Sequence, residues 1–254
     1  MAKAIVVGKV LGQKKLNANT NLIEIAAPEL ANVAAPGQFV NVKVTKHTAP
    51  LLRRPFGVAA VDKTKGTICL IYRILGEATK MLAEFAEGEE LSIVGPLGHG
   101  FDMSAKKPLL VGGGTGLAPL HYLAMGFGAG KTDVLMGGRT ATELFWTELY
   151  KDLSANVYTT TDDGTLGAKG TVMVLLPELL AKGYDCVYVC GPVPMMKAVA
   201  QACAEAGVKC QVSLEKYMAC GLGACLSCAC EGIGKRLKVC KDGPVFWAEE
   251  VGEW

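Results

Sequence analysis

The sequence predicts a mixed fold: an antiparallel β-barrel, then a parallel α/β sheet, then a small cysteine-rich domain. Short apolar runs separated by turn residues extend to about residue 100, and strands alternate with helical patterns from about residue 105. The first rhythm is typical of barrels or sandwiches, whereas the second favours a parallel sheet with helices on both faces. From about residue 211, glycine, cysteine and turn residues dominate. We therefore expect domains over residues 1–102, 103–210 and 211–254.

The first domain is expected to contain short strands and one helix. Turn residues such as Pro36-Gly37 and Gly95-Pro96 separate its apolar runs. A helix is expected over Thr79–Phe85, where the apolar residues follow a helical spacing. The expected strands are Ala4–Val10, Leu22–Ala26, Phe39–Val44, Val58–Val61, Thr67–Tyr72 and Leu91–Val94.

The second domain is expected to contain four strand–helix units. Repeated units of this kind place parallel strands side by side, with the helices as crossovers. The expected strands are Leu109–Val111, Thr132–Met136, Asn156–Thr160 and Cys186–Cys190. The helices that follow them are expected around Leu120–Ala124 and over Glu143–Asp152, Val172–Ala181 and Met195–Glu205.

Composition limits the classes of function. Half of the 254 residues are hydrophobic, 20% are charged and the net charge is +2, which provides a core but no basic field for nucleic acid. The uncharged segment Pro108–Gly130 is long enough for a membrane span, but its glycines fit a strand, a turn and a buried helix better. Residues 1–9 contain too short an apolar run for a signal peptide. We expect a cytoplasmic protein with neither nucleic acid nor membrane as partner.

Ten cysteines stand out, because reducing conditions in the cytoplasm favour metal or redox chemistry over disulfides. Cys220, Cys225, Cys228 and Cys240 follow the spacing C-x4-C-x2-C-x11-C on a glycine-rich stretch. The first three have the plant-type spacing of [2Fe–2S] ligands. Zinc is an alternative, although only Cys225 and Cys228 form the paired knuckle that zinc sites use. Unliganded thiols are a third possibility, and Cys230, which breaks the spacing, is expected to pack inward.

Two glycine loops are expected to hold a nucleotide. Gly112–Gly116 follows a strand and precedes a helix, so that backbone N–H groups and a helix N-terminus would face a pyrophosphate. Leu117 stands where the last glycine of the usual fingerprint would be, so an ordinary tight turn remains the alternative. Gly191-Pro192 repeats the arrangement after a later strand, and two such loops would line one crevice.

Two motifs in the first domain offer contacts to a phosphate or a ring. Arg54 stands in the run Arg-Arg-Pro-Phe-Gly, where a guanidinium lies beside a rigid proline. In the second motif Tyr72 could stack on a ring, and Thr79 could cap a helix or contact a phosphate. A solvated basic turn and an ordinary strand-to-helix connection are the alternatives.

The order of these motifs resembles the ferredoxin–NADP reductase superfamily over residues 1–210. The tail is more specific: Glu215-Lys-Tyr-Met-Ala-Cys220, the cysteines after it and Val239-Cys240-Lys-Asp-Gly-Pro-Val-Phe246 closely resemble the electron-transfer subunits of type B dihydroorotate dehydrogenases. This resemblance covers the whole chain.

The resemblance implies an FAD domain, an NAD domain and a [2Fe–2S] tail that work with a separate FMN-containing catalytic subunit in pyrimidine biosynthesis. Dihydroorotate would be oxidised on that partner, and electrons would pass through the cluster and FAD to NAD⁺. A flavin between the two makes chemical sense, because a cluster transfers single electrons whereas nicotinamide takes two. The family also implies a heterotetramer with two subunits of each kind.

The resemblance carries roles to individual residues of this chain. The FAD-binding positions are Arg54, Pro55, Phe56, Gly57, Ile71, Tyr72, Arg73, Ile74, Gly76, Ala78 and Thr79. The nucleotide-binding positions are Gly112, Gly113, Gly114, Thr115, Gly116, Gly191 and Pro192, with Cys190 as the catalytic residue. Cys220, Cys225, Cys228 and Cys240 would hold the cluster.

This chain departs from the family pattern at two positions. The first flavin motif usually has Ser where this chain has Gly57, and the second often has Gly where it has Ala78. Loss of the hydroxyl at residue 57 removes one hydrogen bond to the flavin, on the order of 1 kcal/mol.

Three questions stay open at this point. Another flavin reductase, of the bifurcating ferredoxin–NADP or sulfide dehydrogenase type, is an alternative, although those relatives tend to have Asp where this chain has Cys220. A non-catalytic iron–sulfur or zinc scaffold is a second alternative. Arg139 either contacts a 2′-phosphate, which would favour NADP, or faces solvent; NAD is preferred from the resemblance alone.

Overall fold

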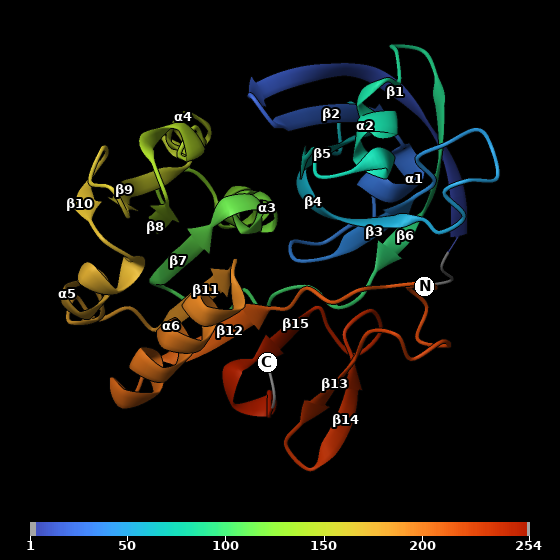
Figure 1. The fold of residues 1–254 in the computed structure, drawn as a ribbon. Coiled ribbons are helices and arrows are strands. Elements are labelled where there is room, and N and C mark those ends of the chain that lie inside the picture. Colours follow the sequence, from blue (N-terminus) through green and yellow to red (C-terminus); the bar gives the residue numbers. More distant parts are fainter. Residues whose placement is uncertain (1–3, 253–254) are drawn as a thin grey trace.

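A computed structural model describes residues 4–252. Residues 1–3 and 253–254, at the outer ends of the first and third predicted domains, lie outside the described residues. The order of elements along the chain is a barrel, a sheet flanked by helices and a tail that returns to that sheet (Figure 1).

The first unit is a closed barrel of six antiparallel strands with the order β1-β2-β5-β4-β3-β6. Apolar side chains such as Ile23, Ile25 and Leu70 alternate inward and fill its interior. Two short helices, α1 (Pro28–Ala31) and α2 (Glu77–Ala83), lie in its connections. The strands are β1 (Ala4–Asn17), β2 (Thr20–Ala26), β3 (Phe39–Val42), β4 (Arg54–Asp62), β5 (Thr67–Arg73) and β6 (Glu90–Leu97).

The second unit is a seven-stranded sheet with the order β10-β9-β8-β7-β11-β12-β15. All neighbours in it are parallel except β12 and β15. The carboxyl ends of the parallel strands therefore share one edge, where β7 and β8 both end on glycine. The strands are β7 (Pro108–Gly113), β8 (Thr132–Gly138), β9 (Ser154–Thr161), β10 (Ala168–Lys169), β11 (Cys186–Cys190), β12 (Lys209–Ser213) and β15 (Val245–Trp247).

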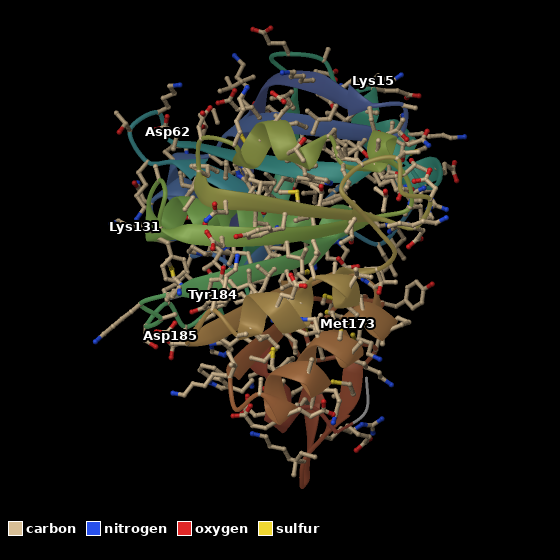
Figure 2. The ribbon with its side chains drawn as sticks, turned by 90° about the vertical axis from the view of Figure 1, so that its left-hand side faces the viewer. Lys15, Asp62, Lys131, Met173, Tyr184 and Asp185 are labelled. Carbon is tan, nitrogen blue, oxygen red and sulfur yellow. The ribbon has the colours of Figure 1, made fainter. Side chains whose placement is uncertain are left out.

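Helices cover both faces of this sheet. On one face, α3 (Leu117–Phe127) and α4 (Trp146–Tyr150) form a core that also includes Ala59 and Ile71 of the barrel. On the other face lie α5 (Leu176–Leu180) and α6 (Val193–Glu205). Figure 1 shows α3 between the sheet and the barrel. Charged side chains such as Lys15, Asp62 and Lys131 point away from the ribbon in Figure 2.

The tail is anchored to both units. It contains the hairpin β13 (Ala229–Gly232) and β14 (Lys235–Lys238), and it returns to the sheet as β15. Cys230, Leu237 and Phe246 share one buried cluster with Val212 of the sheet and Leu97 of the barrel. The inward packing expected for Cys230 is therefore observed.

The predicted fold class is confirmed, with differences in several elements. The helix predicted over Glu143–Asp152 is only α4, preceded by a 3₁₀ turn at Ala141–Glu143. The one predicted over Val172–Ala181 is a 3₁₀ turn at Val172–Val174 followed by α5. Pro177 explains the second break, because proline fits the first turn of a helix but not its interior.

The sheet also extends beyond the predicted range 103–210. The boundary at residue 210 falls inside β12, and β15 adds a further strand from the tail. The domain ranges therefore stay a prediction, and the described tail belongs structurally to the sheet at both of its ends.

Among residues 4–252, the structure has no helix with the length and apolar character needed to cross a lipid bilayer.

Candidate cofactor sites

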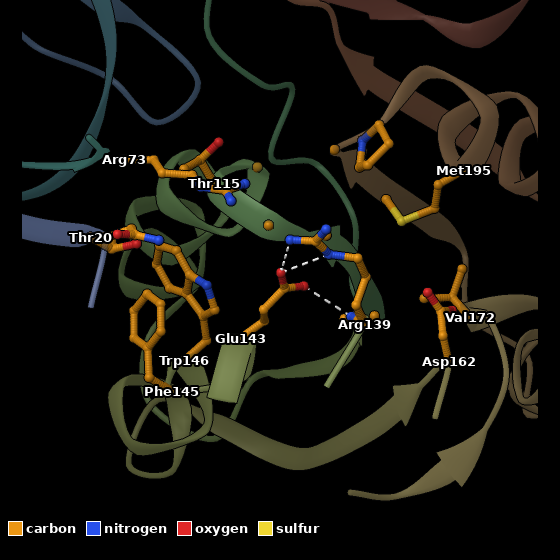
Figure 3. Close-up of a pocket in the computed structure, with 18 of the residues that line it drawn as sticks. Thr20, Arg73, Thr115, Arg139, Glu143, Phe145, Trp146, Asp162, Val172 and Met195 are labelled. Atoms are coloured by element: carbon orange, nitrogen blue, oxygen red, sulfur yellow. Dashed lines mark hydrogen bonds and ion pairs between the residues drawn. The ribbon is translucent and has the colours of Figure 1, made fainter. Parts of the chain in front are cut away.

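A cavity of about 800 Å³ opens at the carboxyl edge of the parallel sheet, where open α/β sheets bind ligands (Figure 3). The turn between β1 and β2 of the barrel forms its opposite wall. Of the residues predicted for cofactors, Arg73, Gly113, Gly114, Thr115, Gly116, Gly191 and Pro192 line it. The structure thus brings together the two glycine loops and one residue of the second flavin motif.

Close contact between the loops explains their glycines. A methyl group on Gly116 would overlap the carbonyl of Cys190, and one on Gly191 would lie 3.0 Å from backbone atoms of Gly113. Gly114 has a φ of +57°, in the left-handed region that glycine adopts without strain. Side chains at these positions would separate the β7–α3 loop from the β11–α6 loop and widen the floor of the cavity.

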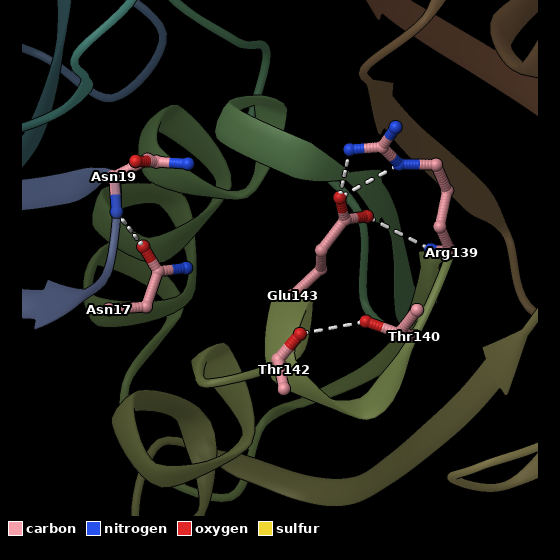
Figure 4. Close-up of polar contacts among 6 residues, drawn as sticks. All are labelled: Asn17, Asn19, Arg139, Thr140, Thr142 and Glu143. Atoms are coloured by element: carbon pink, nitrogen blue, oxygen red, sulfur yellow. Dashed lines mark hydrogen bonds and ion pairs between the residues drawn. The ribbon is translucent and has the colours of Figure 1, made fainter.

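An ion pair stands at one side of this cavity. The Arg139 Nε donates to Glu143 Oε1 at 2.8 Å, and the Arg139 backbone N–H donates to Oε2 at 2.9 Å (Figure 4). This hydrogen bonding raises the pKa of Arg139 and lowers the pKa of Glu143. The Arg139 side chain is thus largely exposed and paired with Glu143, and the choice between NAD and NADP stays a prediction. Asn17 closes the facing turn by accepting from the Asn19 backbone N–H at 2.9 Å.

A second cavity, of about 700 Å³, lies between the barrel and the tail. Its barrel side contains five of the predicted FAD positions: Arg54, Pro55, Gly76, Ala78 and Thr79. Its other side is Lys216–Ala219 and Ser227, the segment that leads into the predicted cluster. Leu75 lines both cavities, so the two sites adjoin at this residue.

Thr79 has a structural role at the edge of the second cavity. Its hydroxyl accepts from the backbone N–H groups of Leu75 at 2.9 Å and Gly76 at 3.2 Å, and donates to the Gly76 carbonyl at 3.0 Å. The helix-capping alternative for Thr79 is therefore observed, and it fixes the start of α2 at the cavity.

Other predicted FAD positions do not line either cavity. Tyr72 is buried, its hydroxyl donates to Gln13 Oε1 at 2.6 Å, and its ring packs edge-on against Phe56 with centroids 5.7 Å apart. Ile71, Ile74 and Gly57 are likewise absent from the lining of these cavities. Their assignment to FAD stays a prediction, and in this structure Tyr72 and Phe56 belong to the barrel core.

The four predicted cluster cysteines come together on the tail in two adjacent pairs. In each pair the backbone N–H of the later cysteine donates to the sulfur of the earlier one, at 3.5 Å for Cys225 and Cys220 and at 3.4 Å for Cys240 and Cys228. Other backbone N–H groups also point at the sulfurs: Leu222 to Cys220 Sγ (3.3 Å) and Gly223 to Cys240 Sγ (3.1 Å). Such donors stabilise thiolate and sulfide charge, so the residues present fit a [2Fe–2S] cluster.

The pKa values of Cys220 and Cys225 are both lowered, which favours the thiolate form that binds iron. Hydrogen bonds from Ser227 and from backbone groups lower the pKa of the exposed Cys225 thiol to about 6. Burial alone would raise the pKa of Cys220, but the N–H groups of Leu222 and Cys225 outweigh it and lower that pKa. Among the residues that the structure describes, no three His, Cys, Asp or Glu side chains are grouped around a single-ion site.

Cys190, predicted as catalytic, is buried at the end of β11. Its thiol donates to the Ser213 carbonyl at 3.6 Å, and burial raises its pKa far above the ordinary value. Cys190 and the equally predicted Gly112 are not in the lining of the first cavity, although their neighbours Gly191 and Gly113 are. The catalytic assignment of Cys190 stays a prediction.

Sequence reasoning missed several residues of both cavities. They lie at strand ends, in turns and in the first turns of α4 and α6, and no motif in the sequence marks them. The missed residues of the first cavity include Asn17, Asn19, Glu143, Trp146, Asp162, Met195 and Glu215. Burial raises the pKa of the Glu215 carboxyl, which follows β12.

Comparison with known proteins gives the same three parts. Residues 8–101 match the oxidoreductase FAD-binding domain, residues 110–201 the oxidoreductase NAD-binding domain, and residues 215–252 the iron–sulfur cluster binding domain of dihydroorotate dehydrogenase B. The dihydroorotate dehydrogenase B (NAD(+)) electron transfer subunit of Caldanaerobacter subterraneus subsp. tengcongensis is 45% identical over 221 residues, which are 85% of this chain and 86% of that protein. The chain belongs to the dihydroorotate dehydrogenase B electron transfer subunits.

A second relative carries the same name, and a solved structure of a differently named oxidoreductase is similar in fold. The dihydroorotate dehydrogenase B electron transfer subunit of Fusobacterium nucleatum subsp. nucleatum is 40% identical over 227 residues, covering 85% of this chain and 86% of its own. A structure of an NADH-dependent reduced ferredoxin-NADP oxidoreductase aligns over 96% of this chain and 89% of its own, with a TM-score of 0.85 and 29% identity. The family membership and the three cofactor-binding domains predicted from the sequence are thus confirmed.

Proposed function

We propose that this chain transfers electrons from dihydroorotate, oxidised on an FMN-containing catalytic partner, through a [2Fe–2S] cluster and FAD to NAD⁺. The observation that supports this most directly is the continuity of the three sites. The nucleotide cavity and the FAD cavity adjoin at Leu75, and the FAD cavity is walled by the segment that enters the cluster at Cys220. Sites in contact are what electron transfer along a chain of carriers requires.

The residues of the chain bind and orient the carriers. Arg54 supplies a cation at the FAD cavity, where the hydrogen bonds of Thr79 fix the start of α2. The glycine loops after β7 and β11 let the nicotinamide nucleotide approach the backbone closely, with Cys190 behind them as a neutral thiol. When bound, the cluster transfers single electrons, FAD accepts one or two, and NAD⁺ takes hydride.

The pair Arg139–Glu143 favours NAD over NADP. A carboxylate after the second strand of a dinucleotide fold commonly accepts a hydrogen bond from the ribose 2′-hydroxyl, whereas a free arginine accommodates a 2′-phosphate. In this chain Glu143 accepts hydrogen bonds from Arg139 and adds negative charge beside the cavity.

The partner is proposed to dock on the exposed side of residues 220–228, which are called the cluster loop below. The assembly is proposed to contain two subunits of each kind. Cys225 is exposed, and the side chains of Leu222 and Leu226 beside it are 45% and 55% exposed. Exposed apolar side chains around a redox centre suit a protein interface. The expected mass of the purified complex is that of the heterotetramer.

The test of the proposed function is Cys225→Ser in the full chain. The variant is expected to lose the cluster and nearly all electron flow from dihydroorotate to NAD⁺, while it keeps FAD and NADH-dependent dye reduction. Cys230→Ala, which removes a buried thiol of the same segment, is the matched control and keeps the cluster. Full coupled activity in Cys225→Ser without iron would contradict the proposed route.

A further inference from the structure

Asn41 is a buried polar residue without an evident purpose in the barrel. It lies on β3, opposite Pro55 of β4 on one side and Val94 of β6 on the other, and is only 1% exposed. Its Oδ1 has no hydrogen-bond partner among residues 4–252; Thr160 Oγ1 is the one other such buried side-chain atom in that range. A buried amide oxygen without a partner destabilises a fold, so its presence calls for an explanation.

The carboxamide of Asn41 faces the cluster loop. A methyl group on Gly221 would overlap Asn41 Nδ2 and lie 3.1 Å from its Cγ. Gly221 has a φ of +68° and immediately follows Cys220. Only a glycine in this left-handed conformation lets the turn rest on the asparagine.

The turn that rests on Asn41 also carries two of the N–H groups aimed at sulfur. Leu222 N–H points at Cys220 Sγ and Gly223 N–H at Cys240 Sγ. The asparagine therefore lies behind the segment whose orientation sets these donors. Asn41 is also the register partner of Pro55, which lines the FAD cavity. Asn41 therefore lies next to both the cluster loop and the lining of the FAD cavity.

We propose that Asn41 is a positioning residue for the iron–sulfur cluster: its carboxamide holds the Gly221 turn so that the N–H groups of Leu222 and Gly223 stay on the sulfur atoms. This inference rests on the proposed cluster at the four cysteines. Hydrogen bonds to the sulfurs stabilise the more negative, reduced cluster and so raise its reduction potential. Asn41 thereby adjusts the potential of the cluster without touching a ligand sulfur.

The test compares Asn41→Leu and Asn41→Asp in the full chain, purified without oxygen. Leu has nearly the same size but no polar atoms, and Asp keeps the shape but places a charged oxygen where the amide nitrogen lies beside Gly221. Both are expected to make the cluster harder to reduce, by about tenfold in the reduction equilibrium or 59 mV for a one-electron couple. Potentiometric titration followed by electron paramagnetic resonance measures this shift and any change in the cluster signal.

Thr160→Val is the matched control, because it removes the other unpartnered buried oxygen, on β9 away from the tail. It is expected to keep the wild-type potential, and all three variants are expected to keep FAD. Loss of iron with FAD retained in either Asn41 variant would also support the proposal, since the loop then depends on the carboxamide.

Two results would overturn it. One is full iron content with wild-type potential and signal in both Asn41 variants; the other is loss of FAD together with iron in both, which would make Asn41 a residue of barrel folding alone. Absence of iron and sulfide from the wild-type chain would instead refute the cluster itself. The two failures are therefore distinguishable.

Discussion

At the scale of single residues, small side chains decide how closely the carriers approach the protein. Gly57 is such a position: it lies on β4 facing α3, and a methyl group there would meet Pro119 carbons at 3.5 Å. This is an ordinary van der Waals distance, so the serine that the family usually has would fit without strain. The missing hydroxyl is therefore not excluded by packing.

Gly57→Ser is expected to bind FAD about fivefold more tightly than the wild type, because one added hydrogen bond contributes about 1 kcal/mol. Equilibrium titration of FAD into the apoprotein measures the change. Gly57→Ala adds the same carbon without the hydroxyl and is expected to match the wild type. Equal affinity in the serine and alanine variants would show that the hydroxyl makes no contact with FAD.

Glu143→Gln is expected to release Arg139 toward the nucleotide cavity. The ratio of kcat/KM for NADPH to that for NADH should rise by about tenfold, since a freed guanidinium can pair with the 2′-phosphate. Steady-state dye reduction with each nucleotide gives this ratio. Glu148→Gln, which breaks the exposed pair with Lys151 on α4, is the control. An unchanged ratio in Glu143→Gln would contradict the assignment of this pair to nucleotide choice.

At the scale of elements, α3 connects the barrel to the sheet. Its His121 Nδ1 lies 2.8 Å from the Ala59 carbonyl on β4, and the ring packs edge-on against Tyr150 of α4 with centroids 5.3 Å apart. Burial lowers the pKa of His121, and the hydrogen bond to Ala59 only partly opposes this. The neutral imidazole is thus the form that the folded interface accepts.

Acidification is expected to weaken this contact. The unfolded chain binds a proton at the ordinary histidine pKa of about 6.5, whereas folded His121 resists it, so stability falls as pH drops through that value. The thermal midpoint of wild type should therefore fall more between pH 7.5 and 5.5 than that of His121→Gln, which never charges. His47→Gln removes an exposed imidazole and serves as control. An equal fall in His121→Gln and wild type would contradict this source of pH dependence.

The elements also show what sequence patterns determine. Apolar alternation and turn residues identified the barrel strands, and glycine at the strand ends identified the two loops that line the first cavity, because both signals are local. The break before α5 was available from the sequence, because Pro177 disfavours a helix interior, but apolar periodicity alone did not reveal it or the short α4. The strand β15 was invisible because its three residues are too few to carry a pattern. Tyr72 and Phe56 contact each other from the neighbouring strands β5 and β4, which a linear motif does not show.

At the scale of the whole molecule, two cavities and a cysteine loop form one sequence of adjoining sites. The cysteine spacing predicted the loop, but its contacts with the barrel arise from long-range packing of Gly221, Asn41 and Leu97. The exposed side of the loop is the part left for a partner.

Leu222→Gln is expected to weaken association with the catalytic subunit by about tenfold or more, because burying a leucine contributes about 1.5–3 kcal/mol. Calorimetric titration with that subunit measures the affinity. Leu166→Gln, at a 37% exposed leucine in the loop after β9, is the matched control. NADH-dependent dye reduction by the isolated chain should be unchanged in both. Wild-type affinity in Leu222→Gln would remove this loop from the interface.

The return of the tail to β12 has a consequence for how such proteins can be assembled from parts. Ser213 and Val245 face each other on adjacent antiparallel strands, and the Leu214 N–H donates to the Pro244 carbonyl at 2.9 Å. Residues 215–243 are therefore a cassette with neighbouring entry and exit points. A short hairpin turn in its place would keep the pairing of β12 with β15 but would remove the Lys216–Ala219 wall of the second cavity. Conversely, inserting this segment between two edge strands of a related reductase would add a site for a carrier of single electrons.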